Sequence, residues 1–213
     1  MKNIIKISGL LISSIFVASC ASSKIDTFEV NETKYEEALN NFDTINYTLN
    51  VNTITSIYFT DGSCSTLVAT GTLTVNNNMI KSESTINNEI TTTYYYLKED
   101  NNYYTYTLNS EINEYVKSTI EEETYKTNRN QNFKKTLTGL YNKFTFLNNK
   151  YTLVKLDKSD YIYEPIKLKF TNDKLVEFNY HKSMNTSSST ILEDTEINIE
   201  YKDVNIELPK ASS

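Results

Sequence analysis

The sequence predicts a mainly β, α+β protein: a curved antiparallel sheet, or open half-barrel, with two short helices packed on its concave face. Three observations support this fold class. Apolar and polar residues alternate over most of the chain, Asn- and Asp-rich turns separate the alternating segments, and only two segments follow a helical period instead. Because an amphipathic helix must cover its apolar side, both helices are expected on the apolar face of the sheet.

The predicted strands begin after Asp43, where apolar residues occupy every second position: Ile45, Tyr47, Leu49 and Val51. The same alternation recurs at 67–75, 90–96, 104–108 and, less cleanly, 111–120. Turn sequences separate these segments at 61–62, 76–78, 87–88 and 100–102. The C-terminal third repeats the pattern at 166–170, 176–180, 197–201 and 204–208. These segments predict a meander of antiparallel strands with one apolar and one polar face.

Two segments depart from the two-residue period. Thr33 and Glu36 fit a capping box, and the apolar residues that follow recur at helical spacing, which predicts a short helix over 34–41. A second helix is predicted over 130–143, where one stripe holds Phe133, Leu137, Leu140, Tyr141 and Phe144. The three consecutive glutamates at 121–123 could gather a divalent cation, but consecutive side chains alternate faces on a strand and fan apart on a helix. A solvated loop is therefore favoured.

The N-terminus carries the most specific motif of the chain. Two lysines precede an apolar stretch at 7–17 that is too short to span a membrane, which predicts a secretory signal peptide over residues 1–19. The sequence Val17-Ala18-Ser19-Cys20 resembles the lipobox of bacterial lipoproteins. The resemblance implies a diacylglyceryl group on Cys20, which would become the first residue and anchor the protein to the bacterial cell membrane from outside the cytoplasm.

The predicted domain organisation follows from this motif. Residues 1–19 form the signal peptide, and residues 20–30 form the lipidated cysteine and a short polar tether. Residues 31–213 form a single β-rich extracytoplasmic domain, and no other stretch approaches the length of a membrane span.

The order of the predicted elements, a helix, a long meander, a helical insertion, more strands and the final segment 201–209, resembles the LolA-like lipoprotein-carrier superfamily. The resemblance implies an open β-barrel whose helices cover an apolar cavity that holds acyl chains. Carriers of that family are free periplasmic proteins, whereas this chain has a lipobox, which favours a tethered lipid-binding role over shuttling. We expect a lipid or other hydrophobic ligand in a cavity lined by residues among Leu49, Val51, Leu73, Tyr94, Tyr96, Phe133 and Phe178.

Composition argues against several other classes. The net charge of -6 and the single arginine, Arg129, argue against a nucleic-acid surface. No Walker or dinucleotide motif is present. His181 is the one histidine, and Cys64 is the one cysteine left after lipidation, which is too few for a zinc site. A Ser-His-acid site would have to use His181, which falls on the polar phase of its strand between Tyr180 and Lys182, so a solvated histidine is favoured. We expect no catalytic activity, metal or cofactor, although sequence spacing does not test paired carboxylates.

Tyrosine supports an alternative function. The chain has 17 tyrosines and no tryptophan, and several tyrosines cluster on predicted strands, at 94–96, 103–106, 115 and 161–163. Such rings are common at binding surfaces, but tyrosine is also favoured in strands generally. The alternative is a surface interaction or antigenic lipoprotein with a packed core, whose Thr- and Tyr-rich polar face binds another macromolecule.

Overall fold

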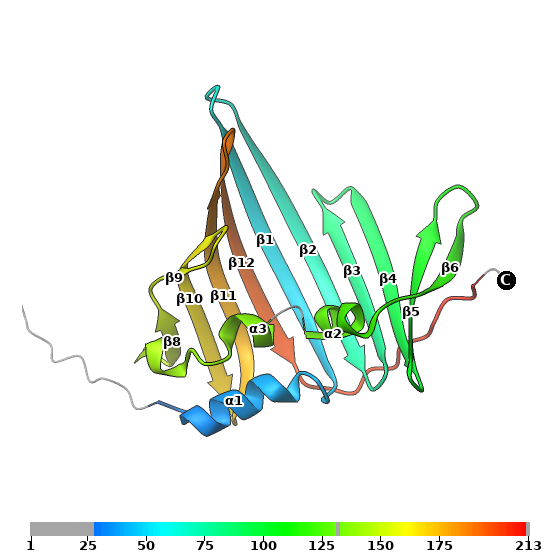
Figure 1. Cartoon of the computed structure of the whole chain (residues 1–213), viewed down its shortest axis with the longest axis horizontal. Coiled ribbons are helices and arrows are strands. Elements are labelled where there is room, and N and C mark those ends of the chain that lie inside the picture. The colour runs from blue at the N-terminus through cyan, green and yellow to red at the C-terminus, as the bar shows by residue number, and fades with distance from the viewer. Residues whose placement is uncertain (1–27, 131–132, 212–213) are drawn as a thin grey trace, which may run out of the picture.

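The computed structural model describes residues 28–130 and 133–211. Their twelve strands form one antiparallel sheet that does not close, in the order β6-β5-β4-β3-β2-β1-β12-β11-β10-β8-β7, with β9 paired to β10 (Figure 1). The mainly β fold class with an open curved sheet is therefore confirmed. The signal peptide, Cys20 and most of the tether lie outside the described residues.

The first half of the chain forms a simple meander of neighbouring strands, and the second half returns to place its last strand beside the first. The meander comprises β1 (Tyr47–Phe59), β2 (Cys64–Asn76), β3 (Met79–Ile86), β4 (Ile90–Glu99), β5 (Asn102–Asn109) and β6 (Glu114–Thr119). The second half comprises β7 (Thr145–Leu147), β8 (Lys150–Leu153), β9 (Leu156–Asp157), β10 (Ile162–Thr171), β11 (Lys174–Asn185) and β12 (Ser189–Glu200). β12 pairs with β1 along its whole length.

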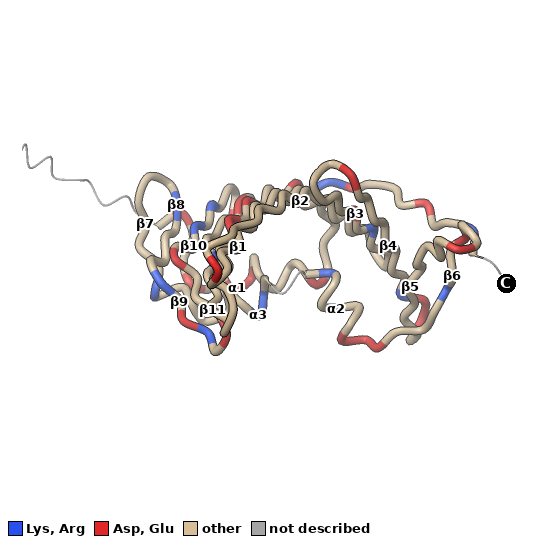
Figure 2. The backbone as a smooth tube through the Cα atoms, turned by 90° about the horizontal axis from the view of Figure 1, so that it is seen from above, with Lys and Arg blue, Asp and Glu red and all other residues tan. Residues whose placement is uncertain are grey.

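Three short helices lie on the concave side of the sheet: α1 (Glu32–Asn41), α2 (Glu122–Asn130) and α3 (Phe133–Leu137). Viewed from above, the strands form an arch with these helices inside it (Figure 2). They cover only the end of the sheet at which β1 begins, whereas the tips of the β1–β2, β3–β4 and β11–β12 hairpins lie at the opposite end (Figure 1). We call these the covered end and the distal end. No described helix is long and apolar enough to cross a membrane.

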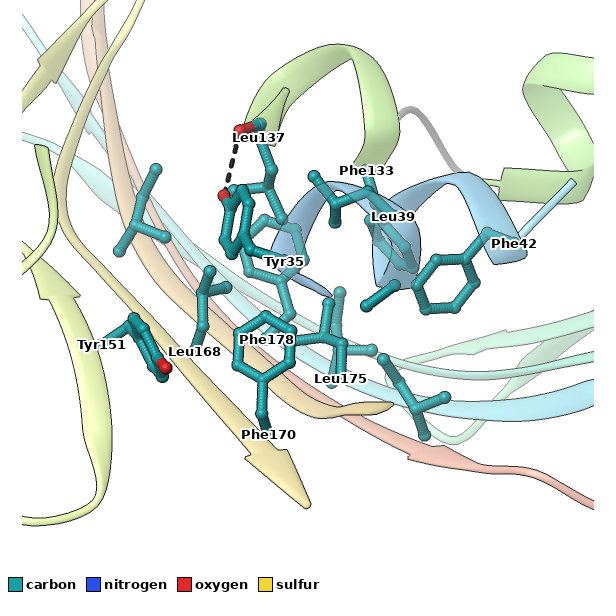
Figure 3. Packing of buried hydrophobic residues seen from close by; sticks show 14 of the residues in the cluster. Tyr35, Leu39, Phe42, Phe133, Leu137, Tyr151, Leu168, Phe170, Leu175 and Phe178 are labelled. Atoms are coloured by element: carbon teal, nitrogen blue, oxygen red, sulfur yellow. Dashed lines mark hydrogen bonds between the residues drawn. The ribbon is translucent and has the colours of Figure 1, made fainter. Parts of the chain in front are cut away.

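Aromatic rings and leucines fill the space between the helices and the covered end (Figure 3). Phe42, the C-cap of α1, is fully buried, and its ring packs edge-on against Tyr47 of β1 at 5.1 Å and against Phe133 of α3 at 5.8 Å. Tyr35 is also fully buried, and its hydroxyl donates to the Leu137 carbonyl at 2.9 Å, which ties α1 to α3. Burial of each such side chain contributes about 1.5–3 kcal/mol, so this layer holds the helices in place.

The helix predicted at 34–41 is confirmed, but its cap is a different residue. Asn31 is the N-cap, and its side-chain oxygen accepts from the Lys34 N–H at 2.9 Å. Glu36, expected to complete a capping box with Thr33, instead accepts from the Gly139 N–H at 2.8 Å. Thr33 lies inside the first turn of α1, so the predicted capping box does not form.

The second predicted helix, at 130–143, is wrong as a continuous element. The structure has α2 before it, then the short α3, a break at Gly139 with a φ of 73°, and a 3-10 helix, η1 (Tyr141–Lys143). A positive φ ends a helix, and glycine adopts it readily. The stripe itself does face the core, because Phe133, Leu137, Leu140 and Phe144 are all buried. Of the three glutamates at 121–123, expected in a loop, Glu121 precedes α2, whereas Glu122 and Glu123 form its first turn.

The strand predicted at 204–208 does not form. β12 already has β1 on one side and β11 on the other, so the chain after it has no free edge there to pair with. It runs instead toward β6 at the edge of the sheet, where Tyr115 and Ala211 form an isolated bridge (Figure 1). The Asn76 amide donates to the Val204 carbonyl, and Ile206 is buried, so the apolar residues of this segment still find cover.

Candidate functional site: two hollows on the concave face

Two hollows flank β12 on the concave face. The first, which we call the strand groove, has a volume of about 180 Å³ and lies over β1, β2 and β3. Its lining includes Val51, Thr53, Ala69, Gly71, Leu73 and Ser84. Gly71 stands directly opposite Val51 on one side and Ser84 on the other, so the hollow lies where a side chain is missing. A Cβ at Gly71 would lie 3.1 Å from the Glu83 carbonyl oxygen, which is tight for any larger residue.

The second hollow, which we call the tyrosine pocket, has a volume of about 410 Å³. It lies between α3, the segment before β10, and strands β10 and β11. Its lining residues are Phe133, Lys135, Thr136, Lys158, Tyr161, Tyr163, Phe178 and Tyr180. The rings form a continuous wall, with centroids 5.3 Å apart for Tyr161 and Tyr163, 5.2 Å for Tyr163 and Tyr180, and 5.3 Å for Tyr180 and Phe178.

The buried hydroxyls of this wall remain protonated. Burial raises the pKa of Tyr163 to about 12, with a further contribution from the neighbouring Tyr161. Burial also raises the pKa of Tyr180, whose hydroxyl donates to the Glu193 carboxylate at 3.0 Å. The same carboxylate is paired with the Lys182 ammonium at 2.8 Å. The acid next to the wall is therefore neutralised by Lys182.

Only β12 separates the two hollows. Thr195 of β12 lies opposite Tyr180 of the tyrosine pocket on one side and Thr53 of the strand groove on the other. The Thr195 and Thr53 hydroxyls are 3.1 Å apart and hydrogen-bond to each other. Because each hydroxyl has the other as a partner, this row does not need water to satisfy it. Thr195 itself is buried, so of this row Tyr180, Thr53 and Ala69 border the two hollows.

The structure separates the seven predicted cavity residues into three groups. Val51 and Leu73 line the strand groove, and Phe133 and Phe178 line the tyrosine pocket. Leu49 is fully buried beneath the helices and lines neither hollow. Tyr94 and Tyr96 also point to the concave side, since they pair with Ser82 and Ile80, but they line neither hollow.

Sequence reasoning missed the residues that give the tyrosine pocket its chemical character, Tyr180, Lys135 and Lys158. Tyr161 and Tyr163 were noted only as part of a tyrosine-rich surface. Tyr180 continues the alternation of Phe178 on the same strand, and this was the available signal. No sequence signal placed Lys135 or Lys158, because they come from α3 and from the segment before β10, which meet only in the folded chain.

A third hollow, of about 330 Å³, lies beside α2 and is lined largely by polar groups, Arg129 among them. Arg129 is buried, and its guanidinium donates to the carbonyls of Phe42 at 3.2 Å, Ile45 at 2.9 Å and Asn77 at 2.8 Å. Its own carbonyl accepts from the Tyr47 hydroxyl. These bonds join α2 to the chain around β1, so we assign Arg129 a structural role.

His181 and Cys64 lie away from both hollows. His181 Nδ1 is 2.8 Å from an Asp194 oxygen, and both residues lie on the convex face. Cys64 is exposed at the start of β2. Among residues 28–130 and 133–211, no three His, Cys, Asp or Glu side chains gather as a metal site.

Comparisons with known proteins show likeness of fold only. No protein-family model and no curated protein sequence matches the chain. A solved LolA superfamily protein from Nitrosomonas europaea is 8% identical, with a TM-score of 0.34, covering 83% of this chain and 96% of its own. An S-type phycobiliprotein lyase from Guillardia theta is 8% identical, with a TM-score of 0.29 and coverage of 84% and 100%.

A third solved structure, a DUF1329 family protein from Desulfovibrio piger, is 10% identical, with a TM-score of 0.27 and coverage of 82% and 94%. A LolA superfamily protein is thus among the structures that this chain resembles. Identities and TM-scores this low transfer no site residue to this chain.

Proposed function

We propose that this protein is a membrane-anchored extracytoplasmic lipoprotein that binds a lipid or other hydrophobic ligand on its concave face, without catalysis. The observation that carries the proposal is the pair of hollows beside β12. Both lie within the arch of a sheet that stays open. Aromatic rings make up most of the lining of the tyrosine pocket, and in the strand groove Val51, Ala69 and Leu73 lie among threonines, serines and Glu83. Ligand pockets in proteins commonly combine these features.

Exposed apolar side chains beyond the strand groove extend this surface toward the distal end. Leu67 is 38% exposed, Ile86 is 42% exposed and Ile90 is 61% exposed. Strand register places all three on the same face as Val51 and Ala69. A contiguous apolar surface left open to water is costly unless it has a partner, and a hydrophobic ligand in the groove would cover it.

The chemistry of the tyrosine pocket supports binding without catalysis. Acid–base catalysis works best with a group whose pKa lies near the working pH. Burial raises the pKa values of Tyr163 and Tyr180 far above neutrality. Glu193, whose carboxylate accepts from the Tyr180 hydroxyl, is also paired with Lys182.

The lipobox at Cys20 supports the anchor. Phe28 packs against Tyr151 with ring centroids 5.2 Å apart, and the backbone of Val30 exchanges hydrogen bonds with the Tyr151 hydroxyl. The chain between Cys20 and Phe28 can span at most about 30 Å. A diacylglyceryl group on Cys20 would therefore hold the sheet close to the membrane surface.

The test is native mass spectrometry of residues 22–213, followed by organic extraction of the copurified material. Residues 28–211 contain the whole sheet, so this chain retains the fold. We expect a lipid or acyl species near one per protein. Ala69→Phe should reduce its occupancy at least about ten-fold by filling the strand groove, whereas the matched control Val68→Phe, on the opposite face, should not.

A clean mass that does not change on addition of phospholipid or fatty acid would overturn the ligand proposal. Apolar residues near the hairpin tips favour the second candidate, binding of another macromolecule. Tyr58 is 50% exposed and Ile112 is 54% exposed. A clean mass would move the search to protein partners of this distal end.

The anchor is tested separately on the full-length protein recovered from bacterial membranes. We expect the mass of the mature N-terminus to show a diacylglyceryl group on Cys20 and the loss of residues 1–19. Cys20→Ser should remain uncleaved and unlipidated. An unmodified Cys20 in the wild-type protein would contradict the anchor.

A further inference from the structure

We infer that the ligand of the concave face is a single-chain anionic amphiphile, whose negatively charged headgroup binds Lys135 and Lys158 and whose apolar chain crosses β12 to the strand groove. This inference rests on the proposed function and names the chemical class of its ligand. It comes from the uneven distribution of charge along the surface between the two hollows.

At the tyrosine pocket, lysines outnumber carboxylates. Glu193 is paired with Lys182, which also stands 5.8 Å from the centroid of the Tyr161 ring. Lys135 and Lys158 line the pocket as well, and neither has a carboxylate partner among the described residues. The lining of the tyrosine pocket thus includes two lysines from separate elements and no acid, although Lys135 also borders another hollow together with Asp43 and Glu123.

The wall next to these lysines provides apolar contact and neutral hydrogen-bond donors. Phe133 and Phe178 pack edge-on with ring centroids 5.2 Å apart, and both rings border the pocket. Since burial raises the pKa of Tyr163 to about 12, the wall carries no negative charge at neutral pH that would repel an anion. The pocket therefore suits a headgroup that bears a negative charge.

The other end of the surface suits an apolar chain. From Tyr180 the concave row runs through Thr195 and Thr53 to Ala69, which is three steps between neighbouring strands, or about 14 Å. Beyond Thr53 the strand groove presents Val51, Ala69 and Leu73 among threonines and serines. Its lining contains no lysine and one acid, Glu83, which is paired with Lys81 at 2.9 Å. The site is therefore polarised, with cations at the tyrosine pocket and apolar side chains at the strand groove.

The experiment compares laurate with lauryl alcohol, which has the same apolar chain and no charge, by isothermal titration calorimetry on residues 22–213 stripped of copurified lipid. We expect laurate to bind about ten-fold tighter than the alcohol at low salt, as two partly solvated ion pairs would give. The double variant K135Q/K158Q should lose that advantage and should bind lauryl alcohol as the wild type does. Lauryl phosphate, run in parallel, distinguishes a phosphate headgroup from a carboxylate.

The control is K143Q/K167Q, which removes the same number of positive charges from exposed lysines outside both hollows. It should bind all three amphiphiles as the wild type does. Equal affinity of the wild type for laurate, lauryl phosphate and lauryl alcohol would overturn the charge inference and leave the proposed function intact. Equal losses of laurate affinity in the two double variants would also overturn it, because a general loss of charge would explain both. Failure of all three amphiphiles to bind would overturn the proposed function itself.

Discussion

The covered end and the distal end of the concave face belong to the same strands, yet they differ in packing. In β1, Tyr47 and Leu49 are fully buried, whereas Phe59, on the same face, is 41% exposed. The helices account for the difference, since α1 and α3 lie over the first part of the strand and none lies over the last (Figures 1 and 2). Alternation along a strand specifies which face is apolar, but it does not specify whether anything covers that face.

The covered end and the rest of the concave face also differ in what they contribute, the first to stability and the second to ligand binding. At the covered end, the Phe42 ring packs edge-on against the rings of Tyr47 and Phe133. Beside and beyond the helices, the hollows and the open apolar strip remain available to a ligand. Substitutions at the covered end should therefore change mainly the free energy of unfolding, whereas substitutions in the groove should change mainly ligand affinity.

The largest expected effect is that of Phe42→Ala. This substitution removes a fully buried ring that contacts Tyr47, Phe133 and Tyr201, and it should lower the free energy of unfolding by about 3–5 kcal/mol. Phe59→Ala, on the same face of β1 at the distal end, should lower it by about 1 kcal/mol or less, because the Phe59 side chain is 41% exposed already. Urea unfolding measures both. Equal losses would show that the two ends form a single packing unit.

A smaller effect is expected for Arg129→Gln. The change leaves the carbonyls of Phe42, Ile45 and Asn77 without their shared donor at the covered end, and we expect a loss of roughly 2–4 kcal/mol in the free energy of unfolding. Lys126→Gln, on the same helix, is the control; Lys126 is exposed and should change the unfolding free energy very little. The structural role of Arg129 is contradicted if both variants unfold at the same urea concentration.

The smallest effect is a pH dependence centred on Glu177. Although burial opposes ionisation, hydrogen bonds from Lys150 and Lys169 hold the pKa of this carboxyl below its ordinary value. A lowered pKa in the folded state stabilises the protein above the unfolded-state pKa, near pH 4.3, and this stabilisation is lost as the pH falls through the folded-state pKa. Glu177→Gln should therefore reduce stability by up to about 1 kcal/mol at pH 7 and by less at pH 3.

Urea midpoints at the two pH values measure this difference. The matched substitution is Glu196→Gln on β12, since Glu196 is exposed and has no ion pair among the described residues. It should show no such change with pH. The assignment fails if Glu177→Gln and Glu196→Gln follow the same pH dependence.

Much of the fold could be predicted because local patterns and tertiary packing agree. The alternation at 45–51 becomes β1, and the helical spacing after Thr33 becomes α1. Predictions failed where a distant partner decides. The stripe of Phe133, Leu137 and Leu140 faces the core as expected, but Gly139 interrupts the helix, and its N–H binds Glu36 of α1.

The candidate site was predictable only in part, for the same reason. Val51, Leu73, Phe133 and Phe178 were expected on the apolar face and do line the hollows. Leu49 has the same pattern as Val51 but is fully packed. A single-sequence pattern assigns both residues to one face and contains no information on where the helices end.

By itself, the sequence determined the mainly β class, the apolar face of each strand and the first helix, because these depend on residues close together in the chain. Tertiary structure alone decided that β12 would pair with β1, that the helices would cover one end of the sheet only, and that Lys135 and Lys158 would meet at one pocket. Each of these outcomes joins segments far apart in the sequence, and their contacts form only when the whole sheet has assembled.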